Sequence, residues 1–201
     1  MSTPPLYVSY YTIGNGYEVE AEGLIRSLEM HKLPHQVTGV RPGSEAGDWN
    51  WARATQYKAE YIRTMQRLYP DRPLVWLDAD ARVLQRPRLF DWLRCDLAGH
   101  WYRNKEFLSG TVYFAPGKVA REIVERWVIR NSALPHGRCA DQRNLYEVLK
   151  TRQDVRIVNL PPEYTWIDAG SGNDLSGRAY GCRYPVIVHM QASRRLKNPK
   201  R

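Results

Sequence analysis

Cysteine is scarce in this sequence, and the three residues at positions 95, 139 and 182 are widely spaced and form no paired motif. This pattern excludes a disulfide framework and a zinc motif, so a reducing cytoplasm is the expected compartment. No apolar stretch approaches the roughly 20 residues that span a bilayer. The amino end also lacks a basic leader followed by an apolar core, so we expect no signal peptide. No internal repeat or low-complexity linker divides the chain.

Positive charge exceeds negative charge, with 30 Lys and Arg against 21 Asp and Glu and a net charge of +9. The excess favours polyanionic partners such as nucleotides, nucleic acid or acidic membranes, but it does not choose among them. A compact basic run ends the sequence at residues 194–201. We expect this run to be a solvated tail, or a segment that contacts a diphosphate, lipid headgroups or a nucleic-acid backbone.

Apolar segments with strand character alternate with segments of helical periodicity through the first half of the chain. Strands are expected at 6–11, 36–40, 73–77, 96–101, 109–114, 155–158 and 185–189. Helices are expected at 17–32, 52–69, 87–93, 119–130 and 141–150, with a loop at 41–51. This alternation predicts an α/β fold with a mixed, mostly parallel central sheet flanked by helices. We expect one domain over residues 1–193, followed by the basic tail.

The most informative segment is Pro73–Asp80, a short apolar run that ends in Asp78 and Asp80. Residues two apart in an extended chain point to the same side, so the two carboxylates are expected to converge on one cation. Open α/β sheets bind ligands just beyond the carboxyl ends of their strands. A strand followed by a solvated acidic turn is the simpler explanation of the same residues.

The string from Trp76 to Val83 resembles the Asp-x-Asp metal-binding signature of GT-A-type glycosyltransferases, which use nucleotide-diphosphate sugars. The resemblance implies a GT-A (Rossmann-like) fold and a Mn²⁺ or Mg²⁺ ion bound to the diphosphate of the donor. It implies that Asp80 is a metal ligand. Asp78 is expected to share the metal or to reach the ribose or the sugar hydroxyls.

A second apolar strand ends in His189 and is similar to the late strand whose His completes the metal site in several GT-A families. An imidazole at the end of an adjacent strand is chemically suited to Mn²⁺. A hydrogen-bonded His that caps a strand explains the same position. In the family a nearby Lys contacts the diphosphate, which makes Lys197 the candidate, with Arg194 and Arg195 as competitors.

Two further segments resemble family elements that lie beside the donor sugar. The Ser109-Gly110 pair falls within an apolar strand, where glycine permits close approach of a ligand to the backbone or simply marks a bulge. Asp141-Gln142 opens a helix and resembles the Asp-Gln element placed against the reacting sugar. These two residues are the candidates for sugar positioning or catalytic assistance, although Asp141 also suits a helix N-cap.

The first strand ends in Tyr10-Tyr11-Thr12, the position at which the family holds the nucleotide base and ribose. Tyrosine faces stack on bases, and Tyr17 is a further candidate. Lys58 matches a basic position near the donor. Core packing for the tyrosines and a surface location for the lysine explain the same residues.

The sequence therefore predicts a metal-dependent glycosyltransferase that uses a nucleotide-sugar donor, with UDP as the expected nucleotide. Its acceptor is expected to be a hydroxyl group, with hydroxylated DNA bases or an anionic lipid or glycan as candidates. Haloacid-dehalogenase-like phosphatases also use a strand ending in Asp-x-Asp, but on the first strand and with further late acidic residues. A nucleic-acid-binding module suits the charge, but no recognition motif accompanies it.

Overall fold

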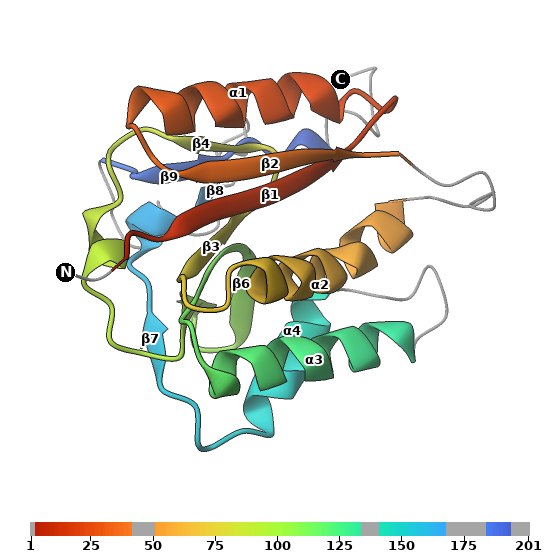
Figure 1. Cartoon of the computed structure of the whole chain (residues 1–201), viewed down its shortest axis with the longest axis vertical. Coiled ribbons are helices and arrows are strands. Elements are labelled where there is room, and N and C mark those ends of the chain that lie inside the picture. Colours follow the sequence, from red (N-terminus) through yellow and green to blue (C-terminus); the bar gives the residue numbers. More distant parts are fainter. Residues whose placement is uncertain (1–2, 42–50, 134–140, 168–183, 194–201) are drawn as a thin grey trace.

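The computed structural model describes residues 3–41, 51–133, 141–167 and 184–193. A six-stranded sheet forms the centre of the molecule, with the strand order β2-β1-β3-β6-β5-β7 (Figure 1). Its strands are β1 (Leu6–Thr12), β2 (His35–Val40), β3 (Leu74–Leu77), β5 (Leu97–Tyr102), β6 (Glu106–Phe114) and β7 (Ile157–Asn159). Three neighbouring pairs run parallel and the two pairs that involve β6 run antiparallel. The predicted fold class is confirmed.

Four α-helices cover the two faces of this sheet: α1 (Tyr17–Met30), α2 (Trp51–Leu68), α3 (Lys118–Ser132) and α4 (Asp141–Lys150). Figure 1 shows α1 on one side, with α2, α3 and α4 together on the other. Each of these four helices begins and ends within two residues of a predicted helix.

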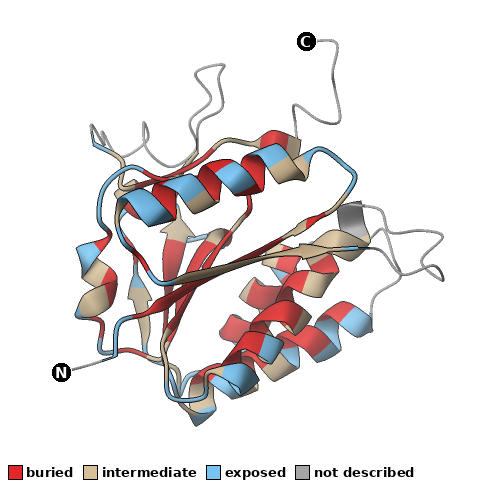
Figure 2. Cartoon of the chain, turned by 45° about the horizontal axis from the view of Figure 1, so that its top comes forward, coloured by how far each residue is buried: buried red, intermediate tan, exposed pale blue. Residues whose placement is uncertain are grey.

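The pleat of the strands sorts the apolar side chains into two cores, because successive residues point to opposite faces. In β1, Leu6 and Val8 join the core under α2 and α3, whereas Tyr7 packs with Leu24 and Leu28 of α1. Figure 2 shows the consequence, since the buried residues of each helix form a stripe that faces the sheet. The site described below lies where this double-sided core ends, at the carboxyl ends of β1 and β3.

A second, three-stranded sheet was not predicted. It consists of β4 (Ala81–Val83), β8 (Trp166–Ile167) and β9 (Ile187–His189), in the order β4-β9-β8. Only β9 was predicted as a strand, within the apolar run at 185–189, whereas β4 and β8 contain three and two residues and are too short for a periodic signal. The segment at 87–93 was expected to be a helix and is instead a 3₁₀ turn at Arg88–Asp91.

Several predicted features lie outside the described residues, including Cys139, Cys182 and the basic run at 194–201 with Lys197. Most of the loop at 41–51 also lies outside them, and helix α2 already begins at Trp51. Within the part of the chain that the structure describes, no helix is long and apolar enough to cross a membrane.

Candidate metal and donor site

Asp78 and Asp80 converge through a turn and not through an extended strand, which corrects the expected geometry. Strand β3 ends at Leu77, and the amide of Ala81 donates to the carbonyl of Asp78 at 2.9 Å. This bond closes a tight turn over residues 78–81. The turn reverses the chain and begins β4, so both carboxylates lie at the edge of the sheet.

His189 also reaches the site by an unpredicted route. It was expected on a strand adjacent to β3, but it lies on β9 of the small sheet, where its register partner is Ala81 of β4. The amide of Met190 donates to the carbonyl of Asp80 at 3.0 Å, and the amide of Ala192 donates to its Oδ2 at 2.8 Å. Pairing of β4 with β9 therefore brings His189 beside Asp80.

The three side chains can hold one metal ion, because one ligand atom from each of Asp78, Asp80 and His189 lies within 4.8 Å of the other two. This spacing is close to the roughly 3 to 4.2 Å that separates two ligands of one Mg²⁺ ion. Two carboxylates and an imidazole suit Mn²⁺ equally well. Burial acts to raise the pKa of Asp80, but His189, the Ala192 amide and Lys58 together hold that pKa below its ordinary value. The carboxylate is therefore ionised at neutral pH.

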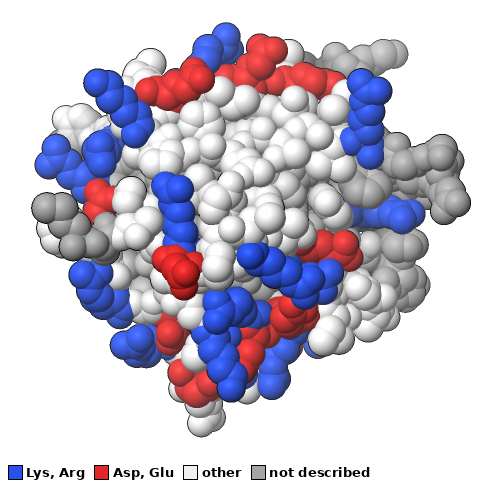
Figure 3. Space-filling model, viewed as in Figure 1, with Lys and Arg blue, Asp and Glu red and all other residues white. Residues whose placement is uncertain are grey.

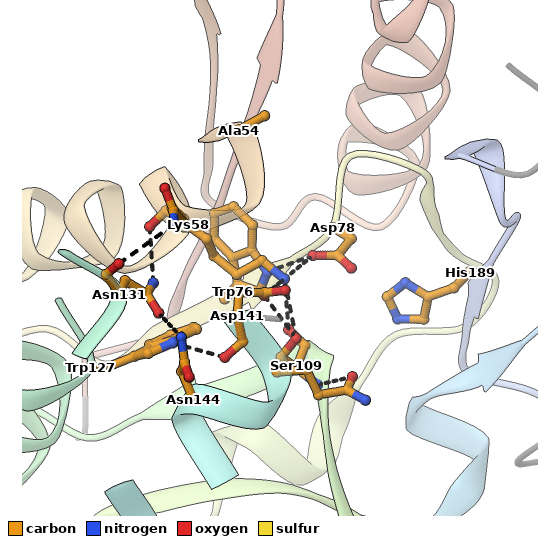
Figure 4. Close-up of polar contacts among 12 residues, drawn as sticks. Ala54, Lys58, Trp76, Asp78, Ser109, Trp127, Asn131, Asp141, Asn144 and His189 are labelled. Carbon is orange, nitrogen blue, oxygen red and sulfur yellow. Dashed lines mark hydrogen bonds and ion pairs between the residues drawn. The ribbon is translucent and has the colours of Figure 1, made fainter. Parts of the chain in front are cut away.

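Lys58 is buried at the centre of the site, so the surface location considered above is wrong for this residue. Its ammonium lies 2.8 Å from Oδ1 of Asp78 and 2.8 Å from Oδ2 of Asp141 (Figure 4). Its side chain also approaches the ring of Trp76, at 5.4 Å from the centroid. Burial alone would lower the pKa of Lys58, but the two carboxylates raise it above its ordinary value. Lys58 therefore stays charged, and its ion pairs link Asp78, a candidate metal ligand, to Asp141.

Asp141 and Gln142 lie on the first turn of α4, and both are bound to β6. The carboxylate of Asp141 accepts hydrogen bonds from Lys58 and from Oγ of Ser109, the latter at 3.1 Å. The side-chain carbonyl of Gln142 accepts from the amide of Ser109 at 3.1 Å, and its amide group donates to Glu106. Both side chains are held in fixed positions beside Ser109, as a role in sugar positioning requires.

Behind Asp141, a buried polar network fixes the start of α4. The indole of Trp127 donates to the main-chain carbonyl of Asp141 at 2.9 Å, and Asn144 donates to Asn131 at 2.9 Å. Asn131 in turn donates to the main chain of Gln56 at 3.0 Å. Figure 4 shows this network on the side of Asp141 away from His189. It links α2, α3 and α4, so the three helices set the position of Asp141 together.

The predicted nucleotide-binding tyrosines lie at the same edge of the sheet. Tyr10 is buried among Tyr57, Tyr61 and Trp76, and its hydroxyl donates to the carbonyl of Ala54. Burial first, then Asp141 and Asp78, raise the pKa of Tyr10 well above its usual value.

Tyr17 is more exposed than Tyr10. Burial, followed by Asp80 and Asp78, raises its pKa to about 12. Both tyrosine hydroxyls are therefore protonated at neutral pH. The Tyr10 hydroxyl already donates its proton to Ala54, so it can act toward a ligand only as an acceptor. Tyr11 is half-buried and Thr12 is buried.

One cavity of about 530 Å³ unites these residues. Its volume falls in the usual range for a small-molecule site. Of the thirteen residues predicted for the site, twelve line it, and the thirteenth, Lys197, lies outside the described residues. The lining includes Tyr10, Tyr11, Thr12, Tyr17, Lys58, Asp78, Asp80, Ser109, Gly110, Asp141, Gln142 and His189, together with Asn15, Thr55, Trp76, Thr165, Ile167 and Gln191.

Sequence reasoning missed Trp76, whose indole nitrogen donates to Oδ1 of Asp78 at 2.9 Å. The signal was present, because Trp76 lies in the apolar run that leads into the acidic pair, two positions before Asp78. It also missed Thr111, whose hydroxyl lies 2.8 Å from Nε2 of His189. The only sequence signal for that contact is a hydroxyl side chain two positions after Ser109 on the same strand.

Gly110 offers a direct test of the metal site. A Cβ added there would lie 2.9 Å from Cε1 and 3.2 Å from Nδ1 of His189, and 3.3 Å from Oδ2 of Asp78. Gly110→Ala is therefore expected to displace the imidazole and to weaken Mn²⁺ binding roughly 10- to 100-fold. Titration calorimetry with Mn²⁺ measures the affinity, and thermal unfolding of the metal-free variant reports whether the sheet is intact. Unchanged affinity would contradict the assignment.

Neither protein-family models nor curated proteins match this sequence. Solved structures with a similar fold were found. A glycosyltransferase involved in the glycosylation of the major capsid of PBCV-1 superposes with a TM-score of 0.71 and 14% identity, over 98% of this chain and 98% of its own. The apo form of glycosyltransferase GlyE from Streptococcus pneumoniae TIGR4 superposes with a TM-score of 0.58 and 14% identity. That match covers 94% of this chain but only 54% of GlyE. The fold is thus one that glycosyltransferases use, as the sequence resemblance predicted.

Proposed function

We propose that this protein is a divalent-metal-dependent glycosyltransferase that transfers a sugar from a nucleotide-diphosphate donor, with a UDP-sugar as the expected donor. The observation that carries the proposal is the meeting of Asp78, Asp80 and His189 in one cavity, beside the Lys58–Asp141 ion pair. The fold shared with solved glycosyltransferases supports it.

The metal is proposed to be Mn²⁺ or Mg²⁺, held by Oδ2 of Asp78, by Asp80 and by Nδ1 of His189. A bound divalent cation supplies neutralisation of the negative charge that develops on the departing diphosphate. Lys58 and Trp76 occupy Oδ1 of Asp78, so the other oxygen is the one left to face the site. Gly110 leaves room at this point for a ligand between the carboxylate and the imidazole.

The remaining residues are assigned to the donor. Tyr10, Tyr11, Thr12 and Tyr17 contact the nucleoside, where an aromatic ring stacks on the base and hydroxyls bond the ribose. Ser109 and Gly110 lie along the sugar, and Asp141 and Gln142 hold its hydroxyl groups near the reacting carbon. Lys197 is proposed to contact the diphosphate.

The acceptor is proposed to be a hydroxyl group on a polyanion, such as a hydroxylated base in DNA or an anionic lipid or glycan, because the chain carries a net charge of +9. The described lining of the cavity does not carry this positive charge, since Lys58 is outnumbered there by Asp78, Asp80 and Asp141. An anionic acceptor is therefore expected to bind to basic residues outside this lining. The rate of sugar transfer to it should fall as salt is added.

The competing functions have less support. The Asp-x-Asp turn follows β3 and not the first strand, and the third member of the candidate metal cluster is His189 and not an acid. On the face seen in Figure 3, basic residues form separate groups mixed with acidic ones, and acidic residues gather at the upper edge, along α1. This arrangement does not favour nucleic-acid binding on the face shown.

A thermal-shift panel of nucleotide sugars, with and without Mn²⁺, tests the proposal. One nucleotide sugar is expected to stabilise the protein strongly and only with the metal, by about 2.7 kcal/mol at a concentration 100 times its Kd. Stabilisation by simple phosphate esters without nucleotide preference would favour a phosphatase. A shift with DNA alone would favour the binding module.

A further inference from the structure

Thr111 contacts His189 on the side of the imidazole that faces away from the two carboxylates. It follows Gly110 on β6, and its Oγ1 lies 2.8 Å from Nε2 of His189. Thr111 is fully buried, and His189 is only 4% exposed. Because water cannot replace this contact, the hydroxyl is the partner that the Nε2 atom depends on.

The other ring nitrogen of His189 faces the carboxylates. Its Nδ1 lies 3.8 Å from Oδ1 of Asp80, beyond hydrogen-bond distance but suitable for a cation held between the two atoms. A histidine binds a metal through a nitrogen that carries a lone pair and no proton. Metal binding through Nδ1 therefore requires the proton of the neutral imidazole to lie on Nε2.

We propose that Thr111 is a positioning residue whose hydroxyl oxygen accepts a hydrogen bond from the Nε2–H of His189 and so leaves the Nδ1 lone pair directed at the metal. The inference rests on the proposed function, because it concerns the same metal site. A hydrogen bond from the second nitrogen of a metal-binding histidine fixes both its tautomer and its ring plane. Threonine suits this task because its branched side chain restricts rotation about χ1.

The opposite arrangement is incompatible with the site. If the hydroxyl donated its proton to Nε2, the neutral ring would carry its proton on Nδ1. That N–H would point toward Asp80 and the cation, and the ring could not act as a ligand. The hydroxyl therefore has to act as an acceptor whenever the metal is bound, and its own proton has to be directed elsewhere.

Thr111→Val removes the hydroxyl and leaves the shape of the side chain nearly unchanged. Its affinity for Mn²⁺ alone, measured by calorimetry or by electron paramagnetic resonance, is expected to fall roughly 10- to 100-fold. Thr111→Ser keeps the hydroxyl and should restore most of the affinity. Thr38→Val is the matched control, since Thr38 also lies on a strand and shares a 2.8 Å hydrogen bond with a ring side chain, Tyr61, away from the metal.

The tautomer gives a second readout that needs no metal and no activity. In ¹⁵N spectra of histidine-labelled metal-free protein, with the signal assigned by His189→Asn, the wild-type ring should carry its proton on Nε2. Thr111→Val should lose that preference, whereas Thr38→Val should keep it.

The outcomes separate the two proposals. Equal Mn²⁺ affinities for wild type and Thr111→Val, or a wild-type ring protonated on Nδ1, would overturn the role of Thr111 and leave the glycosyltransferase proposal standing. A wild-type protein that binds a nucleotide sugar but no Mn²⁺ would overturn the metal site itself, and with it the inference about Thr111. Weak binding in Thr111→Val with rescue by Thr111→Ser supports the inference.

Discussion

Asp80→Asn is expected to abolish Mn²⁺-dependent donor binding and to reduce sugar transfer by about a thousandfold. The substitution removes the negative charge of a proposed metal ligand, and metal-assisted charge stabilisation contributes several kcal/mol to such a transition state, where about 1.4 kcal/mol corresponds to a factor of ten. The carbonyl of the new side chain can still accept the hydrogen bond that the Ala192 amide gives to Asp80 at 2.8 Å. The fold should therefore survive, so the loss reports on the metal.

Calorimetry with Mn²⁺ and a UDP-sugar, together with release of the nucleotide in a coupled assay, measures both effects. Asp71→Asn is the matched control, since Asp71 is an exposed acid in the turn before β3 and should behave as wild type. A wild-type thermal shift for Asp80→Asn with Mn²⁺ and donor would contradict the proposed metal site.

Lys58→Met is expected to have the largest effect on stability. The variant leaves Asp78 and Asp141 without the ammonium that lies 2.8 Å from each of them. Removing one partner of a buried ion pair costs about 3 to 5 kcal/mol. We expect about 3 kcal/mol here, the lower end of that range, because the Asp78 side chain is 38% exposed and solvent screens part of its charge.

Urea unfolding measures this loss, and Lys118→Met serves as its control. Lys118 begins α3 with a side chain that is 86% exposed, so its replacement should change the free energy of unfolding by less than about 0.5 kcal/mol. Adding Asp141→Asn to Lys58→Met should recover part of the stability, because one of the two uncompensated charges disappears. Additive losses in the double variant would show that Lys58 and Asp141 are not coupled.

The apolar strand that ends just before Asp78 and the helix that begins at Asp141 could be predicted, because each depends on local pattern. The apolar run that ends in Asp78 is long enough to define β3, and the start of α4 at Asp141 agrees with the prediction. The burial of Lys58 could not be predicted, because an isolated lysine on a helix gives no sign of which carboxylates it will meet.

The small sheet also escaped prediction, for a different reason. Strands β4 and β9 have three residues each, and their pairing joins Ala81 to His189, which are far apart in the sequence. Such pairing depends on long-range packing, so the sequence predicts a strand at 185–189 but does not identify its partner. The route by which His189 meets Asp80 is therefore visible only in three dimensions, although the histidine itself was predicted as a ligand.

The position of His189 on β9 has a consequence for how the protein matures. All six strands of the central sheet precede β9 in the chain, and chains emerge from the ribosome from the amino end. The acidic turn and its supporting sheet are thus translated well before the imidazole of the proposed metal site. If His189 is a ligand, binding of the ion is expected to be one of the last steps of biogenesis, after most of the chain has been translated.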